Sequence, residues 1–233
     1  MDGTPRDRAR ARTMAEIVRI GREHLATEGA AALSLRAVAR DLGVVSSAVY
    51  RYVASRDELL TLLVIAGYDE LGDAVDAALA EVDTSDHRGR LIAIGTAVRA
   101  WAVREPATYA LLFGSPVPGY HAPAERTTGP GTRVIRALVE VWARAYAAGA
   151  LRAPEGPAVP AALTDSFAAV RAELGLDLPD VLLARGVLAW AALFGCVGFE
   201  VFGQYGPDSF GAPEVLFAHQ LELLADLVGM RIE

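Results

Sequence analysis

The sequence predicts an all-α protein, on three observations. Apolar residues recur three or four positions apart in almost every patterned segment, which is the spacing of one helix face. No segment combines strict alternation of apolar and polar residues with β-branched enrichment, as a half-buried strand would. Hydrophobic residues make up 53% of the chain and charged residues 22%, which is enough apolar material for a sizeable core.

The first two helices are placed by their capping residues. Thr13 and Glu16 have the spacing of a capping box, so the first helix is expected to begin there and to end at Gly29. Ser34 is expected to cap the second helix, which ends at Gly43.

A short third helix is expected at about 46–52, before a long one to about Ala80 that opens with the capping box of Ser55 and Glu58. Apolar periodicity predicts the remaining helices at 88–104, 107–114, 131–148, 161–174, 179–203 and 213–229. The proline-rich segments 114–131 and 150–160 are expected to be loops.

The segment 33–60 has the organisation of a helix-turn-helix. A turn that contains a glycine joins its two short helices, and Val44 and Val49 are expected to face the core. The other side of the second helix exposes small side chains and one aromatic hydroxyl, from Ser46, Ser47, Ala48 and Tyr50. Such a helix suits a major groove about 12 Å wide, because bulky side chains would hold its backbone away from the bases.

The charge distribution favours nucleic-acid binding at the N-terminus. The net charge is −7, yet residues 1–56 hold ten arginines and six acidic residues, a net charge of +4. Residues 57–233 carry a net charge of −11. A basic N-terminal part on an acidic body is typical of a protein that binds a polyanion, although acidic surface also simply keeps proteins soluble.

Over roughly residues 13–60 the chain resembles the tetracycline-repressor (TetR) family of regulators. The positions that carry the resemblance are Ser34, Leu35, Arg36, Val38, Ala39, Leu42, Gly43, Val44, Val49, Tyr50, Tyr52, Val53, Ser55, Arg56 and Leu59. The resemblance implies a three-helix helix-turn-helix DNA-binding domain at 1–56, with a basic arm at 1–12, and a helical ligand-binding and dimerisation domain at 57–233. It also implies a double-stranded DNA operator as partner. Both a DNA contact and mere solvation remain open for the arm.

The same resemblance assigns roles within the first domain. Its candidate DNA-binding residues are Arg36, Ser46, Ser47, Ala48, Tyr50, Tyr52 and Arg56. The helix from Ser46 would read the major groove, both tyrosines would contact phosphates or thymine methyl groups, Arg56 would bind phosphate, and Arg36 would reach a guanine or the backbone. A half-buried core position for Tyr50 and a solvated Arg36 are the alternatives. Val45 departs from the family pattern, which usually has a capping serine there.

The two long C-terminal helices are candidates for a homodimer interface, because family members usually pair them with those of a second subunit. Ala191, Gly195 and Gly198 form a stripe of small residues that permits close helix approach, and Leu221 and Leu224 are candidates on the last helix. Burial of these residues within one subunit is the alternative.

A small apolar ligand is expected between the middle helices, where aromatic residues gather. The candidate ligand contacts are Trp101, Tyr109, Phe113, Trp142, Tyr146, Trp190 and Phe194. Tyr109, Tyr146 and Arg144 would supply the few polar groups that orient a ligand. Aromatic residues at helical spacing also fit a plain core, so this alternative stays open.

The residue inventory argues against an enzyme. The chain has no lysine, which excludes P-loop and Schiff-base chemistry, and its four histidines lack metal-binding spacing. We therefore expect no catalytic residue, metal or cofactor. The sequence opens without a signal-like leader, and its longest apolar run, 187–199, has 13 residues. A cytoplasmic protein with a buried core helix, rather than a membrane span, is expected.

The expected function is that of a repressor released from its operator by a small apolar ligand. A transcriptional activator and a ligand-independent regulator of the same fold are alternatives. A helical interaction protein that does not bind DNA is the third class.

Overall fold

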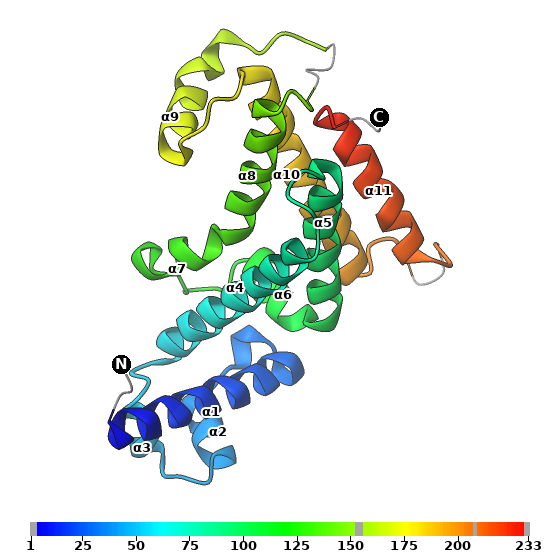
Figure 1. Ribbon diagram of the computed structural model, residues 1–233. Helices are drawn as coiled ribbons and strands as arrows, with labels where there is room; N and C mark the ends of the chain where they lie inside the picture. Colours follow the sequence, from blue (N-terminus) through cyan, green and yellow to red (C-terminus); the bar gives the residue numbers. More distant parts are fainter. Residues whose placement is uncertain (1–3, 152–155, 207–208, 231–233) are drawn as a thin grey trace. The chain divides into compact units, whose positions relative to one another are not determined.

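The computed structural model describes residues 4–151, 156–206 and 209–230, and Figure 1 shows its helices in chain order. The α-helices are α1 (Pro5–Glu28), α2 (Leu35–Asp41), α3 (Ser46–Tyr50), α4 (Arg56–Ala80), α5 (His87–Arg104), α6 (Pro106–Phe113), α7 (Ala124–Gly131), α8 (Arg133–Ala147), α9 (Thr164–Leu174), α10 (Asp180–Val201) and α11 (Pro213–Leu227). Two 3₁₀ helices, η1 (Ala30–Ala32) and η2 (Ala161–Leu163), complete them. The described residues contain no strand, only an isolated bridge between Leu151 and Met230, so the all-α prediction is confirmed.

The chain forms two compact units. The first contains Met1–Glu70 and Glu105–Gly131, and the second contains Leu71–Arg104 and Thr132–Glu233, so that α4 contributes to both. The domain boundary expected after residue 56 stays a prediction.

One apolar core holds α1 to α4 together in the first unit. Its buried members are Ile17, Ile20, Leu33, Leu35, Val38, Ala39, Val49, Val53, Leu59, Leu60 and Leu63. Gly21 of α1 faces α4 at close range, because a Cβ atom there would lie 3.2 Å from Cδ1 of Leu59. This packing fixes the two short helices α2 and α3 on longer ones.

The second unit packs α8, α10 and α11 against α5. Ion pairs reinforce the apolar contacts: Nε of Arg88 on α5 donates to Glu222 of α11 at 2.9 Å, and Nε of Arg99 donates to Glu200 of α10 at 2.7 Å. Charge-assisted bonds of this type are stronger than neutral ones, so α5 is held to both C-terminal helices.

α1 begins at Pro5, so the predicted start at Thr13 is wrong. The Thr4 hydroxyl accepts a hydrogen bond from the Asp7 amide, and the Thr4 amide donates to the Asp7 carboxylate at 3.0 Å, which is a capping box. Thr13 lies inside the helix, where its hydroxyl donates to the carbonyl of Ala9. The described part of the basic arm is therefore mostly helical.

The segment 114–131 is not a loop throughout, because its last eight residues form α7. The amide and hydroxyl of Thr127 donate to the carbonyl of Pro123, and the Arg126 guanidinium donates to the Glu58 carboxylate at 2.7 Å. These contacts, one of them with α4, stabilise a helix that Pro130 disfavours.

The turn between α2 and α3 sets the direction in which α3 leaves α2. Gly43 has φ +72° and its amide donates to the carbonyl of Arg40, while the amide of Val44 donates to the carbonyl of Ala39. This is a Schellman motif, which ends α2 at the predicted glycine. Ser34 holds the N-cap position of α2 as expected, but its side chain makes no capping hydrogen bond.

Replacing Gly43 tests this turn. Gly43→Ala should lower the free energy of unfolding by about 1–2 kcal/mol, because a Cβ atom is strained at this positive φ. Urea unfolding followed by circular dichroism measures the loss. The control Gly43→Asn should lose less, since asparagine tolerates the left-handed region, and an equal loss in both variants would contradict the explanation.

Candidate nucleic-acid interface and ligand cavity

α3 has one face in the core and another in solvent. Val49 is fully buried, whereas Tyr50 is 48% exposed and Ser47 is exposed. Ser46 and Ala48 are partly buried. The prediction that Val44 faces the core is wrong: it is 40% exposed, because the Schellman turn carries it out beyond the end of α2.

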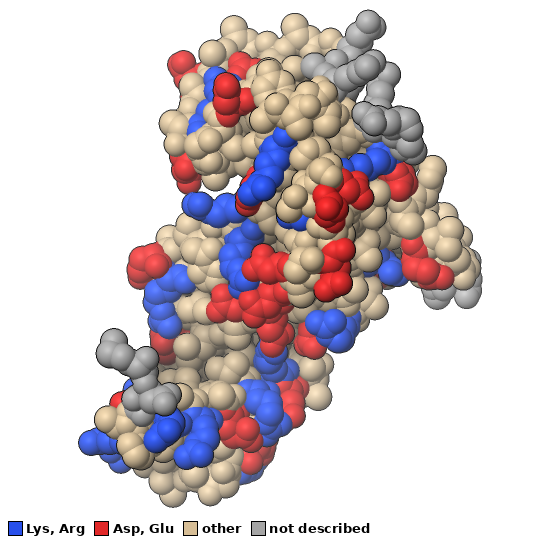
Figure 2. Space-filling model, in the orientation of Figure 1, with Lys and Arg blue, Asp and Glu red and all other residues tan. Residues whose placement is uncertain are grey.

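Exposed arginines lie on the neighbouring helices α1 and α2. Arg36 on α2 is exposed, and the side chain of Arg40 is 73% exposed although its Nε lies 3.2 Å from the Asp41 carboxylate. Figure 2 shows arginine side chains gathered around the N-terminal end of α1. From there, the Arg10 guanidinium lies 5.3 Å from the ring centre of half-buried Tyr52, a cation–π distance. Positive charge and hydrogen-bond donors of this kind suit phosphate groups.

Arg56 has a structural contact that sequence reasoning missed. Its Nη2 donates to the carbonyl of Ala30 at 2.8 Å and to that of Ala31 at 3.3 Å, which ties η1 to the first turn of α4. The Ser55 hydroxyl caps that turn by accepting from the Glu58 amide at 3.1 Å, which is one half of the predicted capping box, while the Glu58 carboxylate accepts from Arg126. The phosphate-binding role of Arg56 stays a prediction.

A second missed contact joins α1 to α2. Nε2 of His24, which is 7% exposed, lies 2.6 Å from the Asp41 carboxylate. This hydrogen bond, with that from Arg40, lowers the pKa of Asp41 below its usual value. His24 therefore holds the base of the helix-turn-helix. No group of three or more potential metal ligands occurs in the described part of the chain.

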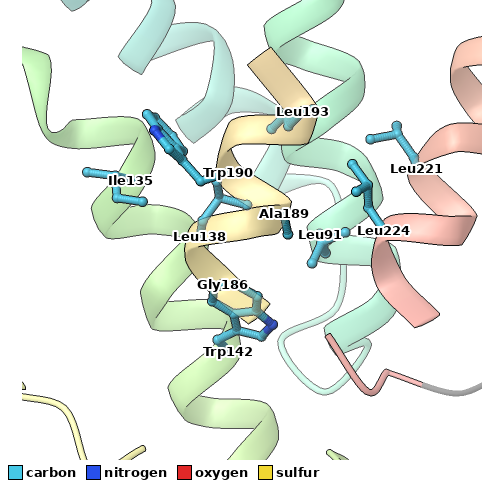
Figure 3. Close-up of a pocket in the computed structure, with 10 residues that line it drawn as sticks. All are labelled: Leu91, Ile135, Leu138, Trp142, Gly186, Ala189, Trp190, Leu193, Leu221 and Leu224. Atoms are coloured by element: carbon cyan, nitrogen blue, oxygen red, sulfur yellow. The ribbon is translucent and has the colours of Figure 1, made fainter. Parts of the chain in front are cut away.

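The second unit contains an apolar cavity between α5, α8, α10 and α11, which Figure 3 shows. Its lining residues are Leu91, Ile135, Leu138, Trp142, Gly186, Ala189, Trp190, Leu193, Leu221 and Leu224. The cavity has a volume of about 20 Å³, which is room for about one water molecule. Trp142 lies directly against α10, because a Cβ atom at Gly186 would be 2.1 Å from its ring.

Among the predicted ligand contacts, the cavity brings together Trp142 and Trp190. Phe194 packs against Trp190 in a tilted arrangement, with ring centres 4.3 Å apart, and Trp101 is fully buried in the same unit. Tyr146 is 39% exposed on α8. None of these last three lines the cavity.

Tyr109 and Phe113 belong to α6 in the first unit. Their ring centres lie 5.2 Å apart, and burial raises the pKa of Tyr109 to about 12. The polar residues expected to orient a ligand, Tyr109, Tyr146 and Arg144, do not line this cavity. Sequence reasoning overlooked Nε1 of Trp142, a polar group of a cavity-lining residue that is buried without a hydrogen-bond partner among the described residues.

α10 presents an apolar face to solvent, so the expectation of a buried core helix is wrong for that face. Val187, Leu188 and Phe199 are 62%, 54% and 48% exposed. By length and composition α10 could cross a membrane, and 33% of its most apolar 18-residue segment is buried in the protein. The exposed side includes the small residues Ala191 and Gly195.

The other candidate dimer residues lie deeper. Gly198 and Leu224 are partly buried, and Leu221 is 1% exposed. Leu221 packs on Gly95 of α5, where a Cβ atom would lie 2.3 Å from its Cδ2. The structure therefore uses Leu221 within one subunit.

Comparison with known families gives two matches. The model described as bacterial regulatory proteins, tetR family, matches residues 13–63. The model described as tetracyclin repressor-like, C-terminal domain, matches residues 91–224.

Relatives resemble the chain over most of its length. The HTH-type transcriptional regulator Rv1816 of Mycobacterium tuberculosis (strain ATCC 25618 / H37Rv) is 48% identical over 222 residues, which is 95% of this chain and 94% of the relative. The solved structure of regulatory protein SCO4313 has a TM-score of 0.76 at 32% identity and covers 96% of this chain and 100% of that one. PfmR from Thermus thermophilus, a TetR family transcriptional regulator, shares the fold, with a TM-score of 0.59, 17% identity and coverage of 93% and 99%.

Proposed function

The chain belongs to the TetR family of bacterial DNA-binding transcriptional regulators, and we propose that it is a homodimeric repressor that a small apolar ligand releases from its operator. The regulator is not an enzyme. Repression, ligand release and the residues that act in them are the parts that go beyond family membership.

The exposed face of α3 supports the DNA-reading role most directly. Ser47 and Tyr50 face solvent while Val49 anchors the helix, which leaves a narrow ridge with one small side chain and one aromatic hydroxyl for the major groove. Arg36 on α2 and Tyr52 beside Arg10 flank that ridge and would contact the backbone. Ser46 and Ala48, on the partly buried sides, would contact bases at its edges.

The salt dependence of DNA binding tests the phosphate role of Arg56. Arg56→Ala should weaken binding to all duplexes and reduce the slope of log affinity against log salt by about 1 per subunit, since one phosphate contact is lost. Fluorescence anisotropy at rising salt measures this slope. The control Arg19→Ala removes an exposed arginine that pairs with Glu16 on α1 and should leave the slope unchanged.

Arg56 also holds the carbonyls of Ala30 and Ala31, so thermal unfolding of both variants is measured in parallel. A folded Arg56→Ala protein with the wild-type salt slope would refute the phosphate role. Absence of any complex for the wild-type dimer at low salt would refute DNA reading itself.

The exposed face of α10 supports the homodimer. A second copy of the chain would cover Val187, Leu188 and Phe199, and the small side chains at Ala191 and Gly195 would let the two helices approach closely. Val215 and Leu223 of α11, 64% and 54% exposed, would extend the apolar area.

A charge at the middle of this face should separate the subunits. Ala191→Arg should convert the dimer into a monomer, as measured by light scattering. It should also weaken operator binding by at least about 100-fold, because each monomer then binds one half-site independently of the other. The matched control Val170→Arg places the same charge on a residue of α9 that is 37% exposed and should leave the dimer intact. A dimeric Ala191→Arg protein would contradict this interface.

The cavity supports a neutral apolar ligand, since all its lining residues are apolar apart from the indole nitrogens. Known small-molecule pockets measure about 300–1,000 Å³, so binding would have to part α8 from α10. Arg133, close to the start of α8, donates to Asp73 of α4 at 2.7 Å and also to Asp76, which links a displaced α8 to α4. The small size of the cavity is also the observation that favours a ligand-independent regulator.

Filling the cavity distinguishes these two functions. Ala189→Leu should raise the dissociation constant for the neutral dye Nile red, and for any compound that releases the operator, by about 10-fold, since one buried side chain displaces the ligand. DNA affinity should not change. Ala100→Leu, the same substitution at an exposed position of α5, is the control. If no neutral compound alters DNA affinity in the wild type, the regulator is ligand-independent.

A further inference from the structure

Two adjacent valines are exposed in the turn that leads into α3. Val45 is 71% exposed and Val44 is 40% exposed, although valine is among the residues most often buried. Val49, four residues after Val45, is the residue by which α3 enters the core. Val44 and Val45 therefore form an apolar patch, the turn patch, that the packing of α3 does not need.

The side chain of Val45 does not cap α3, although the Val45 carbonyl accepts from the Ala48 amide at 2.9 Å. Val45 occupies the N-cap position with φ −68° and ψ 144°, and no side chain caps the helix. A serine, threonine, asparagine or aspartate at this position would accept a hydrogen bond from the first turn. The chain thus exposes an apolar side chain at a position where a polar one would stabilise the helix, which indicates that Val45 acts on a partner.

The surroundings of the turn patch point to DNA as that partner. Arg36 and Arg40 of α2 are exposed, and the Arg40 side chain is 73% exposed. Tyr50, also exposed, is on the helix that follows. An apolar patch among guanidinium groups suits the major groove, where the phosphates lie on both sides and the thymine 5-methyl is the one apolar group on a base edge.

We propose that Val45 contacts the 5-methyl group of one thymine in each half-site and makes the protein prefer a T·A pair there. This inference rests on the proposed reading role of α3. Val45 is chosen over Val44 because it is more exposed and directly precedes the helix. Val44 provides the matched control.

The test removes the methyl groups from both partners of the contact: the 5-methyl group from thymine and the side-chain methyl groups from Val45. Wild-type protein first selects its preferred duplex from a randomised library, and each thymine of that duplex is then replaced in turn by deoxyuridine, which lacks the 5-methyl group. Fluorescence anisotropy measures the affinity of the full-length wild type, Val45→Ser, Val45→Thr and Val44→Ser for every duplex. Urea unfolding of each variant checks the fold.

One thymine per half-site should be sensitive in the wild type, with about a 4-fold loss of affinity on replacement by deoxyuridine, the value of one buried methyl group. Val45→Ser should bind the selected duplex more weakly and lose nothing further at that thymine. Val45→Thr keeps one methyl group and should retain part of the sensitivity, while Val44→Ser should retain all of it. The salt slope should be the same for all four proteins, because no phosphate contact changes.

Equal sensitivity to deoxyuridine in the wild type and Val45→Ser would overturn the proposal, as would a selected site without any sensitive thymine. If only Val44→Ser loses the sensitivity, Val44 and not Val45 makes the contact, and the proposal is overturned as well. These results leave DNA reading by α3 intact. A wild-type protein that enriches no sequence would instead refute the proposed function.

Discussion

The burial of Val49 and Val53 is the constraint on which the DNA-binding part of the molecule depends. α3 has five residues, far fewer than the about 12–15 that an isolated helix needs in water, and no side chain caps it. It is helical because both valines are fully buried in the core of α1, α2 and α4, and because Gly43 directs the chain into it. That burial decides which residues remain for DNA. Because Val49 turns one side of α3 into the core, Ser47 and Tyr50 on the other side are exposed.

The order and extent of most helices could be predicted, because local signals specify them. Apolar spacing and the glycine at 43 place α2 and α3, and Ser55 caps α4 as its sequence indicates. The start of α1 was predicted too late, because Thr13 and Glu16 have the spacing of a capping box although both lie inside the helix. The box that forms pairs Thr4 with Asp7, an aspartate in place of the usual glutamate or glutamine. α7 was missed because its stability comes from a contact between Arg126 and Glu58, 68 positions apart, which local propensity does not contain.

The candidate site was predictable only where a residue type determines its environment. Small and aromatic residues on α3 indicated an exposed face, and the structure places Ser47 and Tyr50 there. The pairing of His24 with Asp41 joins positions 17 apart, and a sequence gives no such distance. The cavity was harder still, because aromatic periodicity marks buried residues without saying which of them leave a gap. Trp142 lines the cavity and also packs on α10 at Gly186, so under the proposed function helix packing and ligand binding would compete for the same ring.

This competition connects the cavity to the proposed dimer through α10. Gly186, Ala189 and Leu193 line the cavity on one side of this helix, while Ala191 and Gly195 lie on its exposed side. Under the proposed function, a ligand that enters would displace α8 or α10, and a displaced α10 would carry its apolar face with it. A five-residue α3 offers few base contacts, so strong operator binding requires both subunits at a fixed spacing. In the proposed homodimer, a small shift of α10 would then weaken DNA binding without any change in α3.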